Sequence, residues 1–263
     1  MEDARRRFLL RPMDSLDLVS IQDTEGAAAP FFSPDGTWLG YVQDQEMKRM
    51  RLSDGSVQTI TRVNKKVFNI ICNKDEMIYW SEVGSGVKCI PARGGEVQQL
   101  TTLSEEDREQ WQIPISFDEK GDFFSLTSIF GDDAAPHAEI VDLRTGTRTW
   151  LHDQANGATI LKSGHMVYTR RNTLLAARAD WNVPSIVGAP VPIIENVETD
   201  FGGTSPYSRY RQMATSSTHP VQRRRHPIRC TGLNGTAPNV KFRYRPTRIS
   251  PPRFPPTENS YCS

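Results

Sequence analysis

The sequence has 263 residues, of which 37% are hydrophobic and 24% are charged, and its formal net charge is +1. This length allows one sizeable core or two small ones, and no apolar stretch approaches the roughly twenty residues that span a membrane. The N-terminal segment MEDARRRFLLRPMDS lacks the apolar core and cleavage site of a signal peptide, so a cytoplasmic location is the default expectation.

Residues 30–42, PFFSPDGTWLGYV, predict a strand, a tight turn and a second strand. Pro34 fixes its φ near the turn value, Asp35 bonds its own backbone, and Gly36 tolerates a positive φ. The alternation of aromatic and aliphatic residues after the turn is typical of a strand that is buried on both faces. A lone hairpin is barely stable in water, so this unit must belong to a larger assembly of strands.

The same pattern returns three times, in ICNKDEMIYWS (71–81), FDEKGDFFSLT (117–127) and LKSGHMVYTRR (161–171). The turns are 39, 46 and 43 residues apart when their positions are taken as Gly36, Asp75, Gly121 and Gly164. This spacing matches the period of about 40–45 residues that is typical of a four-stranded propeller blade.

A second hairpin follows each of the first three copies, with turns at Asp54-Gly55, Gly94-Gly95 and Thr145-Gly146. The fourth copy, residues 173–196, has a longer loop instead, and only residues 104–111 suggest a helical turn, with Ser104 as its N-cap. We therefore predict an all-β fold, a β-propeller of about four to five four-stranded blades that is partial or incompletely closed. A β-sandwich with coincidentally spaced turns is the alternative.

The motif PFFSPDGTWLGYV resembles the WD40-like, TolB-type (PD40) propeller repeat, and DLRTGTRTWL and SGHMVYTRRNTLLAARAD resemble later blades of bacterial propellers of that group. The resemblance covers the chain from about Phe8 to Gly203. It is weaker in the second and third copies, where Asn73-Lys74-Asp75 and Glu119-Lys120-Gly121 replace Pro-Asp-Gly. Such propellers occur in TolB-like proteins, which can be periplasmic or membrane-attached, and behind the catalytic domain of bacterial serine/threonine protein kinases.

The two ends of the chain depart from this pattern. Residues 6–21 resemble the outer hairpin of a blade whose inner strands would lie upstream. Residues 207–263 contain ten Arg, one Lys and eight Pro with one acidic residue, whereas residues 1–206 carry 21 basic and 30 acidic side chains. We predict a propeller fragment over 1–206 and a basic, Arg/Pro-rich disordered tail over 207–263. Alternatively the tail is a frameshift product, because FPPTEN (254–259) can be back-translated so that a shifted frame reads Pro-Pro-Asp-Gly-Lys.

Motifs for catalysis or metal binding are missing from the sequence. The kinase motifs and a Gly-x-Ser-x-Gly elbow are absent, and the carboxylates of 118–122 do not fit the calcium-loop pattern. The body has three isolated histidines, His137, His152 and His165, and the cysteines, Cys72, Cys89, Cys230 and Cys262, lack CxxC spacing. We therefore predict that the chain is not an enzyme and has no catalytic residue, cofactor or metal.

Propellers present their loops at two faces around a central channel, where proteins or peptides are usually bound. We expect a non-catalytic scaffold that binds an unidentified protein or peptide partner. It acts either on its own or as the sensor or scaffold part of a larger bacterial serine/threonine protein kinase. Candidate contacts lie in the loops between blades, at Arg62–Lys66 and Glu105–Trp111. Two alternatives are a truncated, frameshifted fragment without independent function, and nucleic-acid binding through the basic tail. Nucleic acid is the weaker expectation because no RNA- or DNA-binding motif accompanies the tail.

Overall fold

The computed structural model describes residues 7–12, 17–131, 135–181, 184–197 and 240–242. The predicted all-β fold is confirmed, because the described elements are strands and the sheets are antiparallel. Four sheets, which we number blades 1 to 4, have four strands each. They consist of β3(Ala28–Phe32), β4(Trp38–Gln43), β5(Glu46–Arg51) and β6(Val57–Arg62); β7(Val67–Cys72), β8(Met77–Glu82), β9(Val87–Pro91) and β10(Gln98–Gln99); β11(Glu109–Phe117), β12(Phe123–Phe130), β13(Ala135–Asp142) and β14(Arg148–Asp153); and β15(Asn156–Ile160), β16(His165–Arg170), β17(Thr173–Asp180) and β18(Ser185–Ile194).

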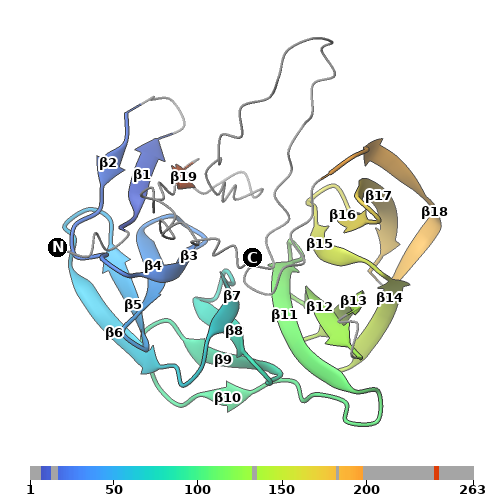
Figure 1. The fold of residues 1–263 in the computed structure, drawn as a ribbon, viewed down its shortest axis with the longest axis horizontal. Coiled ribbons are helices and arrows are strands. Elements are labelled where there is room, and N and C mark those ends of the chain that lie inside the picture. Colours follow the sequence, from blue (N-terminus) through green and yellow to red (C-terminus); the bar gives the residue numbers. More distant parts are fainter. Residues whose placement is uncertain (1–6, 13–16, 132–134, 182–183, 198–239, 243–263) are drawn as a thin grey trace, which may run out of the picture.

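Within each blade the strands follow one another in chain order from the centre of the molecule to its rim (Figure 1). The inner strands β3, β7, β11 and β15 are neighbours around the centre. The described blades form an open arc instead of a closed ring, as the incomplete repeat predicts.

A smaller, three-stranded sheet lies next to blade 1, and two of its strands precede blade 1 in the sequence. It contains β1(Leu9–Pro12), which pairs with β2(Val19–Ser20) on one side and with β19(Val240–Phe242) on the other. The hairpin predicted over 6–21 is thus present as β1 and β2. The remainder of the predicted tail, 207–239 and 243–263, lies outside the described residues, and the division of the chain at residue 206 stays a prediction.

The first turn of each blade places one residue in the left-handed region of backbone conformation. In blade 1 this is Gly36, with a φ of 71°, whose N–H donates to the carbonyl of Ser33 at 2.9 Å. Gly121 and Gly164 take the same position, with φ values of 78° and 77°. In blade 2, however, Glu76 occupies it with a φ of 55°, so the alignment on Asp75 was displaced by one residue. Asp75 precedes it in the turn, where its N–H donates to the side chain of Asn73.

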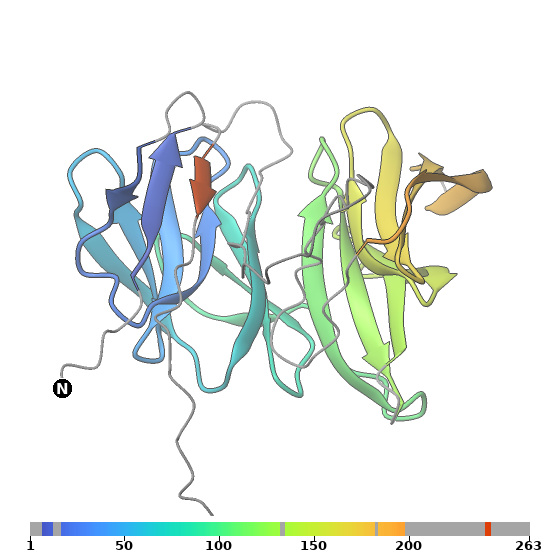
Figure 2. The same cartoon turned by 45° about the horizontal axis from the view of Figure 1, so that its top comes forward.

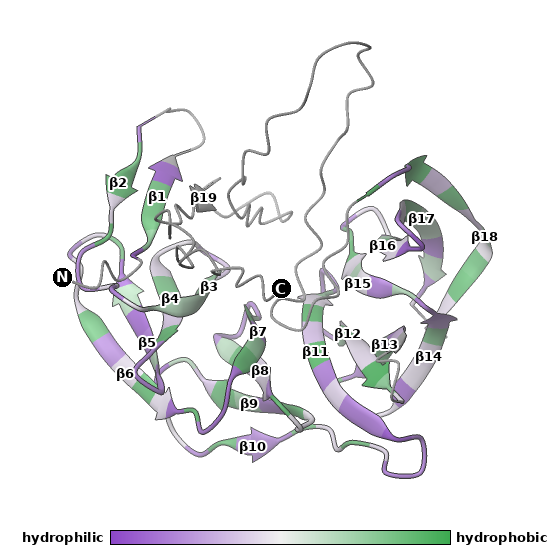
Figure 3. Ribbon diagram, in the orientation of Figure 1, coloured by the Kyte–Doolittle hydropathy of each residue, from purple (hydrophilic) through white to green (hydrophobic). Residues whose placement is uncertain are grey.

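Apolar clusters fill the spaces between neighbouring sheets, and the strands carry most of the hydrophobic residues (Figure 3). The clusters join blades 1 and 2 (Trp38, Trp80), blades 2 and 3 (Tyr79, Phe124), and blades 3 and 4 (Ile140, Tyr168). A fourth cluster packs the β1–β2 hairpin on blade 1 through Leu10 and Leu39. Burial of a side chain such as Ile140 contributes roughly 1.5–3 kcal/mol, so face-to-face packing of blades stabilises the arc.

The part of the chain that the structure describes contains no helix with the length and apolar character of a membrane span.

Candidate functional site

The loops that join consecutive blades lie on one face of the molecule, together with the turn between the second and third strand of each blade (Figure 2). Backbone hydrogen bonds connect these segments: Val63 donates to Gln45 at 2.9 Å, Val83 to Lys66 at 3.0 Å, and Gly131 to Arg108 at 3.1 Å. We call this surface the loop face. Both segments that were expected to make contacts, 62–66 and 105–111, belong to it. The predicted turn positions Pro34, Asp35, Gly36, Asp75, Gly121 and Gly164 lie at the opposite ends of the strands.

Two aromatic side chains meet where the inner strands reach the loop face. The rings of Phe68 and Trp111 are stacked, with centroids 5.4 Å apart and an interplanar angle of 19°. Phe68 lies near the start of β7 and Trp111 near the start of β11, so the pair bridges blades 2 and 3. Both residues are half-buried, so part of each ring is in contact with solvent. Trp111 was in the predicted segment; Phe68 was missed because its run, VFNII, is indistinguishable from a core strand in sequence.

A buried carboxylate holds the loop between blades 1 and 2. Oε2 of Glu82 accepts the backbone N–H groups of Asn64 and Lys65 at 3.2 and 3.1 Å, and Oε1 accepts from Trp80 at 3.3 Å and Lys88 at 2.9 Å. Burial raises the pKa of Glu82, but the hydrogen bonds from Lys88 and Trp80 outweigh it, so the pKa lies below its ordinary value. The loop backbone is therefore fixed while Lys65 is exposed, as is Lys66 next to it.

A second buried cluster supports the loop between blades 2 and 3. Arg148 donates to Oε1 and Oε2 of Glu109 at 2.7 and 3.1 Å, and to Oε1 and Oε2 of Glu139 at 3.0 and 2.8 Å. The two carboxylate side chains are 0% and 4% exposed. Burial disfavours the Arg148 cation, but the hydrogen bonds that it donates to Glu139 and Glu109 raise its pKa above its ordinary value. Glu109 also accepts the N–H of Ser104 at 2.8 Å, so the network anchors the adjoining loop.

The loop that begins at Ser104 forms a turn and not the helical turn that was expected. The Ser104 hydroxyl still accepts the N–H of Asp107, at 3.3 Å, as an N-cap would. The exposed side chains of this loop are mainly acidic: Glu105, Glu106 and Asp107, followed by Arg108. The loop that leads into the strand of Phe68 is therefore basic, and the loop that leads into the strand of Trp111 is mainly acidic.

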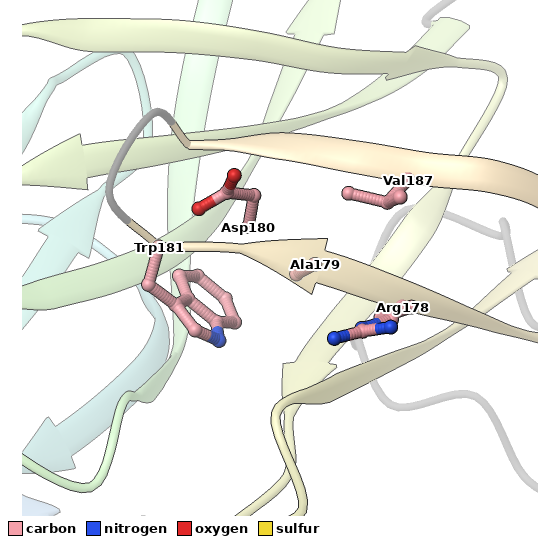
Figure 4. Close-up of a pocket in the computed structure, with 5 residues that line it drawn as sticks. All are labelled: Arg178, Ala179, Asp180, Trp181 and Val187. Carbon is pink, nitrogen blue, oxygen red and sulfur yellow. The ribbon is translucent and has the colours of Figure 1, made fainter.

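A separate pocket of about 450 Å³ lies on blade 4, away from the loop face (Figure 4). Its lining consists of Arg178, Ala179, Asp180, Trp181 and Val187. The Trp181 ring also packs toward Phe123 of blade 3, with centroids 6.1 Å apart. The pocket thus combines apolar surface with one cation and one anion, and none of its described lining residues carries a hydroxyl or a thiol.

The three histidines do not form a common cluster: His137 and His152 stand on the paired strands β13 and β14, and His165, on β16, has Nδ1 3.2 Å from the hydroxyl of the exposed Ser163. The His137 ring contacts the Trp150 ring in a tilted arrangement, with centroids 4.3 Å apart, and Nε2 of His152 accepts from Arg170 at 3.3 Å. His165 contacts the carbonyl of Ser163 at 3.1 Å. Among the described residues no group of three or more His, Cys, Asp or Glu side chains is placed to hold a metal ion.

Two of the cysteines are described, and both have thiols with a raised pKa. Burial, with smaller contributions from the nearby Glu76 and Asp35, raises the pKa of Cys72 to about 12. Burial also raises the pKa of Cys89. Because the thiolate is the nucleophile, burial disfavours nucleophilic chemistry at both sulfurs.

Comparison with known proteins shows the fold. No family model and no curated protein matches the chain. A TolB-like protein from Agrobacterium tumefaciens has a similar structure, with a TM-score of 0.57 and 16% identity over 92% of this chain and 99% of that chain. TolB from Acinetobacter baumannii aligns with a TM-score of 0.48 and 15% identity over 70% of this chain and 52% of that chain. The chain therefore has the TolB-type β-propeller fold.

A third structure corrects the prediction that the chain is not an enzyme. Oligogalacturonate lyase from Vibrio parahaemolyticus aligns with a TM-score of 0.50 and 12% identity, over 65% of this chain and 57% of that chain. An enzyme thus shares this propeller fold. The prediction was wrong because it took the absence of familiar catalytic motifs, together with the fold, as evidence against catalysis.

Proposed function

We propose that this chain is an interaction scaffold that binds an extended protein or peptide segment across the loop face. The observation that supports the proposal is the partly exposed stack of Phe68 on Trp111, which bridges two blades. Aromatic side chains provide a large contact area with few rotatable bonds, and they are enriched at the energetic centres of protein interfaces. A segment that crosses from blade 2 to blade 3 would place an apolar side chain on this pair.

The charges around the aromatic pair indicate the polarity of the partner. Lys65 and Lys66 are exposed on one side, and Glu105, Glu106 and Asp107 are exposed on the other. Complementary charges on a partner increase its association rate and fix its direction of binding. We therefore expect acidic residues toward Lys65 and Lys66, and basic residues toward the 105–107 loop.

The hydrogen bonds that hold both loops in place also favour binding. Glu82 fixes the backbone of one loop and Glu109 that of the other, through the hydrogen bonds described above. A loop that is already ordered loses little conformational entropy when a partner binds. The loop face is therefore preorganised as a contact surface.

A selection experiment tests this proposal. Peptides are selected from a displayed random library on the full chain, and their affinities are measured by fluorescence polarisation. Trp111→Ala and Phe68→Ala should each weaken the selected peptides by about tenfold or more, because truncation of an interface hot spot costs about 2 kcal/mol or more. Exchange of Lys65 and Lys66 for Glu should reverse the charge preference on that side.

The matched control is Trp150→Ala, since Trp150 is a tryptophan that is 50% exposed on the outer strand of blade 3. Its removal should leave the affinities unchanged. Peptides that bind Trp111→Ala and the unmodified chain equally would contradict the proposal, provided that both proteins give the same circular dichroism spectrum.

A narrower proposal follows from the resemblance of the first and fourth blades to kinase-associated propellers. According to this proposal, the chain is the sensor or scaffold portion of a larger bacterial serine/threonine protein kinase. The test is to read the DNA around the coding sequence in all frames. A kinase reading frame continuous with this one would support the proposal, and a complete gene without kinase motifs would overturn it.

A further inference from the structure

Three polar side chains meet between the neighbouring blades 3 and 4, near the loop face. They are His152 of β14, and Tyr168 and Arg170 of β16, and we call them the blade 3–4 cluster. The His152 ring contacts the Tyr168 ring in a tilted arrangement, with centroids 5.5 Å apart, and its Nε2 is 3.3 Å from Nη1 of Arg170. Tyr168 and Arg170 are two residues apart on one strand, so both point to the side of blade 4 that packs on blade 3.

His152 determines which part of the Arg170 guanidinium is engaged. Nδ1 of His152 is 3.0 Å from the backbone carbonyl of Asp153. Because a carbonyl can only accept a hydrogen bond, Nδ1 carries the ring proton, and Nε2 accepts from Nη1 of Arg170. The opposite edge of the guanidinium, with Nε and Nη2, is not used by this contact.

Two buried donors of the cluster have no acceptor among the described residues. They are Nε of Arg170 and the hydroxyl of Tyr168, a residue that is 1% exposed. Burial raises the pKa of Tyr168, and the nearby Arg170 cation only partly offsets this, so the hydroxyl keeps its proton at neutral pH. Buried polar groups nearly always have a hydrogen-bond partner, so two such donors side by side indicate a place for an acceptor.

The charge of Arg170 indicates that this acceptor is an anion. In the part of the chain that the structure describes, no carboxylate forms an ion pair with Arg170. Asp153 follows His152 directly but lies on the other side of the sheet, where it accepts from Nε1 of Trp150 at 2.7 Å. By contrast, Arg148 pairs with two buried carboxylates. An acceptor with a negative charge would satisfy the two donors and the cation together.

We propose that the blade 3–4 cluster binds a carboxylate group, which Arg170 and Tyr168 hold. The Nε and Nη2 donors of a guanidinium lie on one edge and match the two oxygens of a carboxylate. The Tyr168 hydroxyl supplies a third donor, and His152 keeps the guanidinium oriented. The ligand enters from the loop face, because Arg170 is partly exposed and is followed by the exposed Arg171 and Asn172 of the turn to β17.

Acetate is the probe for the first test, because it is little more than a carboxylate. Thermal unfolding of the full chain is followed while acetate replaces chloride at constant ionic strength. A ligand that binds the folded protein raises the melting temperature as its concentration increases. Arg170→Gln should weaken this response by about tenfold or more in acetate concentration, because the charged donors are lost. Arg170→Lys should lose most of it too, since lysine keeps the charge but not the two-donor edge.

The matched control is Arg171→Gln, which removes the same charge from the next residue, whose side chain is exposed. It should respond to acetate like the unmodified chain. General effects of acetate on stability are common to all variants, so the readout is the difference between Arg170→Gln and Arg171→Gln.

Tyr168→Phe separates ligand binding from a structural role of the hydroxyl. In chloride this variant should melt no lower than the unmodified chain, because the hydroxyl has no protein partner to lose. In acetate it should require about fivefold more ligand for the same rise, since one hydrogen bond to the carboxylate is missing. A variant that is destabilised in chloride and responds normally to acetate would contradict the proposal, because a buried water would then be the partner of Tyr168.

The source of the carboxylate is distinguished by a second titration. It compares acetate with N-acetyldialanine, which carries a free terminal carboxylate, and with the amide of the same dipeptide. Tighter binding of the dipeptide than of acetate would indicate the end of a peptide chain, and equal binding would indicate a small carboxylate. The amide should not bind in either case.

Several results would overturn the proposal. One is an unmodified chain that responds to acetate no more than Arg170→Gln does, even where a carboxylate of the chain itself holds Arg170. Others are equal responses of Arg170→Gln and Arg171→Gln, and binding of the amide as tight as that of the free dipeptide. These experiments use no selected peptide and leave Phe68 and Trp111 unchanged, so their failure would not bear on the interaction scaffold proposed above.

Discussion

The side-chain amide of Asn69 donates a hydrogen bond of 2.7 Å to the backbone carbonyl of Pro114, in the buried space between the inner strands of blades 2 and 3. Asn69 is 8% exposed and follows Phe68 directly, while Pro114 stands three residues after Trp111. One polar contact thus connects the two strands that carry the aromatic pair of the loop face.

Asn69→Ala should therefore destabilise the protein by about 1–3 kcal/mol, because the buried carbonyl of Pro114 would lose this partner. Urea unfolding followed by tryptophan fluorescence measures this change. The control is Asn64→Ala, which alters an exposed asparagine of the adjacent loop and should change the free energy of unfolding by less than about 0.5 kcal/mol. Equal effects of the two substitutions would show that the Asn69 contact is not formed in solution.

Glu82 should make the stability of blade 2 dependent on pH. Its pKa is lower in the folded protein than in the unfolded chain, so its contribution is present above the unfolded value of about 4.3 and is lost as the pH falls through the folded value. Glu82→Gln should destabilise by about 1.5–3 kcal/mol at pH 7, and by progressively less below pH 4. Urea unfolding of both proteins across this range measures the difference. A constant difference at every pH would contradict the assignment.

Arg148 should be among the residues whose loss is most destabilising. Arg148→Met would leave Glu109 and Glu139 buried without their counter-ion, at a cost of about 3–5 kcal/mol. Addition of Glu139→Gln to this variant should recover part of the loss, because it removes the repulsion between the two carboxylates. Thermal and urea unfolding measure both changes.

A surface pair provides the control for Arg148. Arg144 contacts Asp142 at 3.3 Å, but its side chain is 80% exposed. Arg144→Met should therefore cost no more than about 1 kcal/mol. A loss as large as that of Arg148→Met would mean that burial does not determine the contribution of these pairs.

Gly40 should not tolerate a side chain, because the Phe31 ring lies directly over it on the paired strand. A Cβ at Gly40 would overlap with this ring. Gly40→Ala should destabilise by about 1–3 kcal/mol, and addition of Phe31→Leu should lessen the penalty of the alanine. A double-mutant cycle by urea unfolding measures the coupling, and strictly additive effects would contradict the contact.

The regular part of the fold was accessible from the sequence because the turns are local. Gly36, Gly121 and Gly164 supply the left-handed residue where a glycine is expected, and the intervals between them are those of blades. In blade 2 the turn has neither proline nor glycine, and its left-handed position falls on Glu76. Composition alone does not reveal a turn that is imposed by the strands on either side of it.

The site was less accessible, because it depends on segments that are distant in the chain. Glu109 and Arg148 begin the first and the fourth strand of blade 3, so two strands lie between them in sequence, and the folding of the sheet brings them together. Phe68 is similarly part of the loop face only because β7 and β11 are neighbours around the centre. Loop composition indicated the exposed lysines and acids, but it did not indicate the buried carboxylates that hold them.

The consecutive order of strands within each blade also bears on synthesis of the chain. Every strand pairing in blades 1 to 4 joins neighbours in sequence, so one blade can form as soon as its own residues have left the ribosome. Such pairings close only the loops between consecutive strands, so the entropy cost of forming one sheet is small. The pairing of β1 with β19 is different, since it joins residues 9–12 to residues 240–242 and requires all the residues between them to have been synthesised. Among the described residues, β1 and β2 pack on blade 1 through the cluster that contains Leu10 and Leu39, and this contact can form earlier.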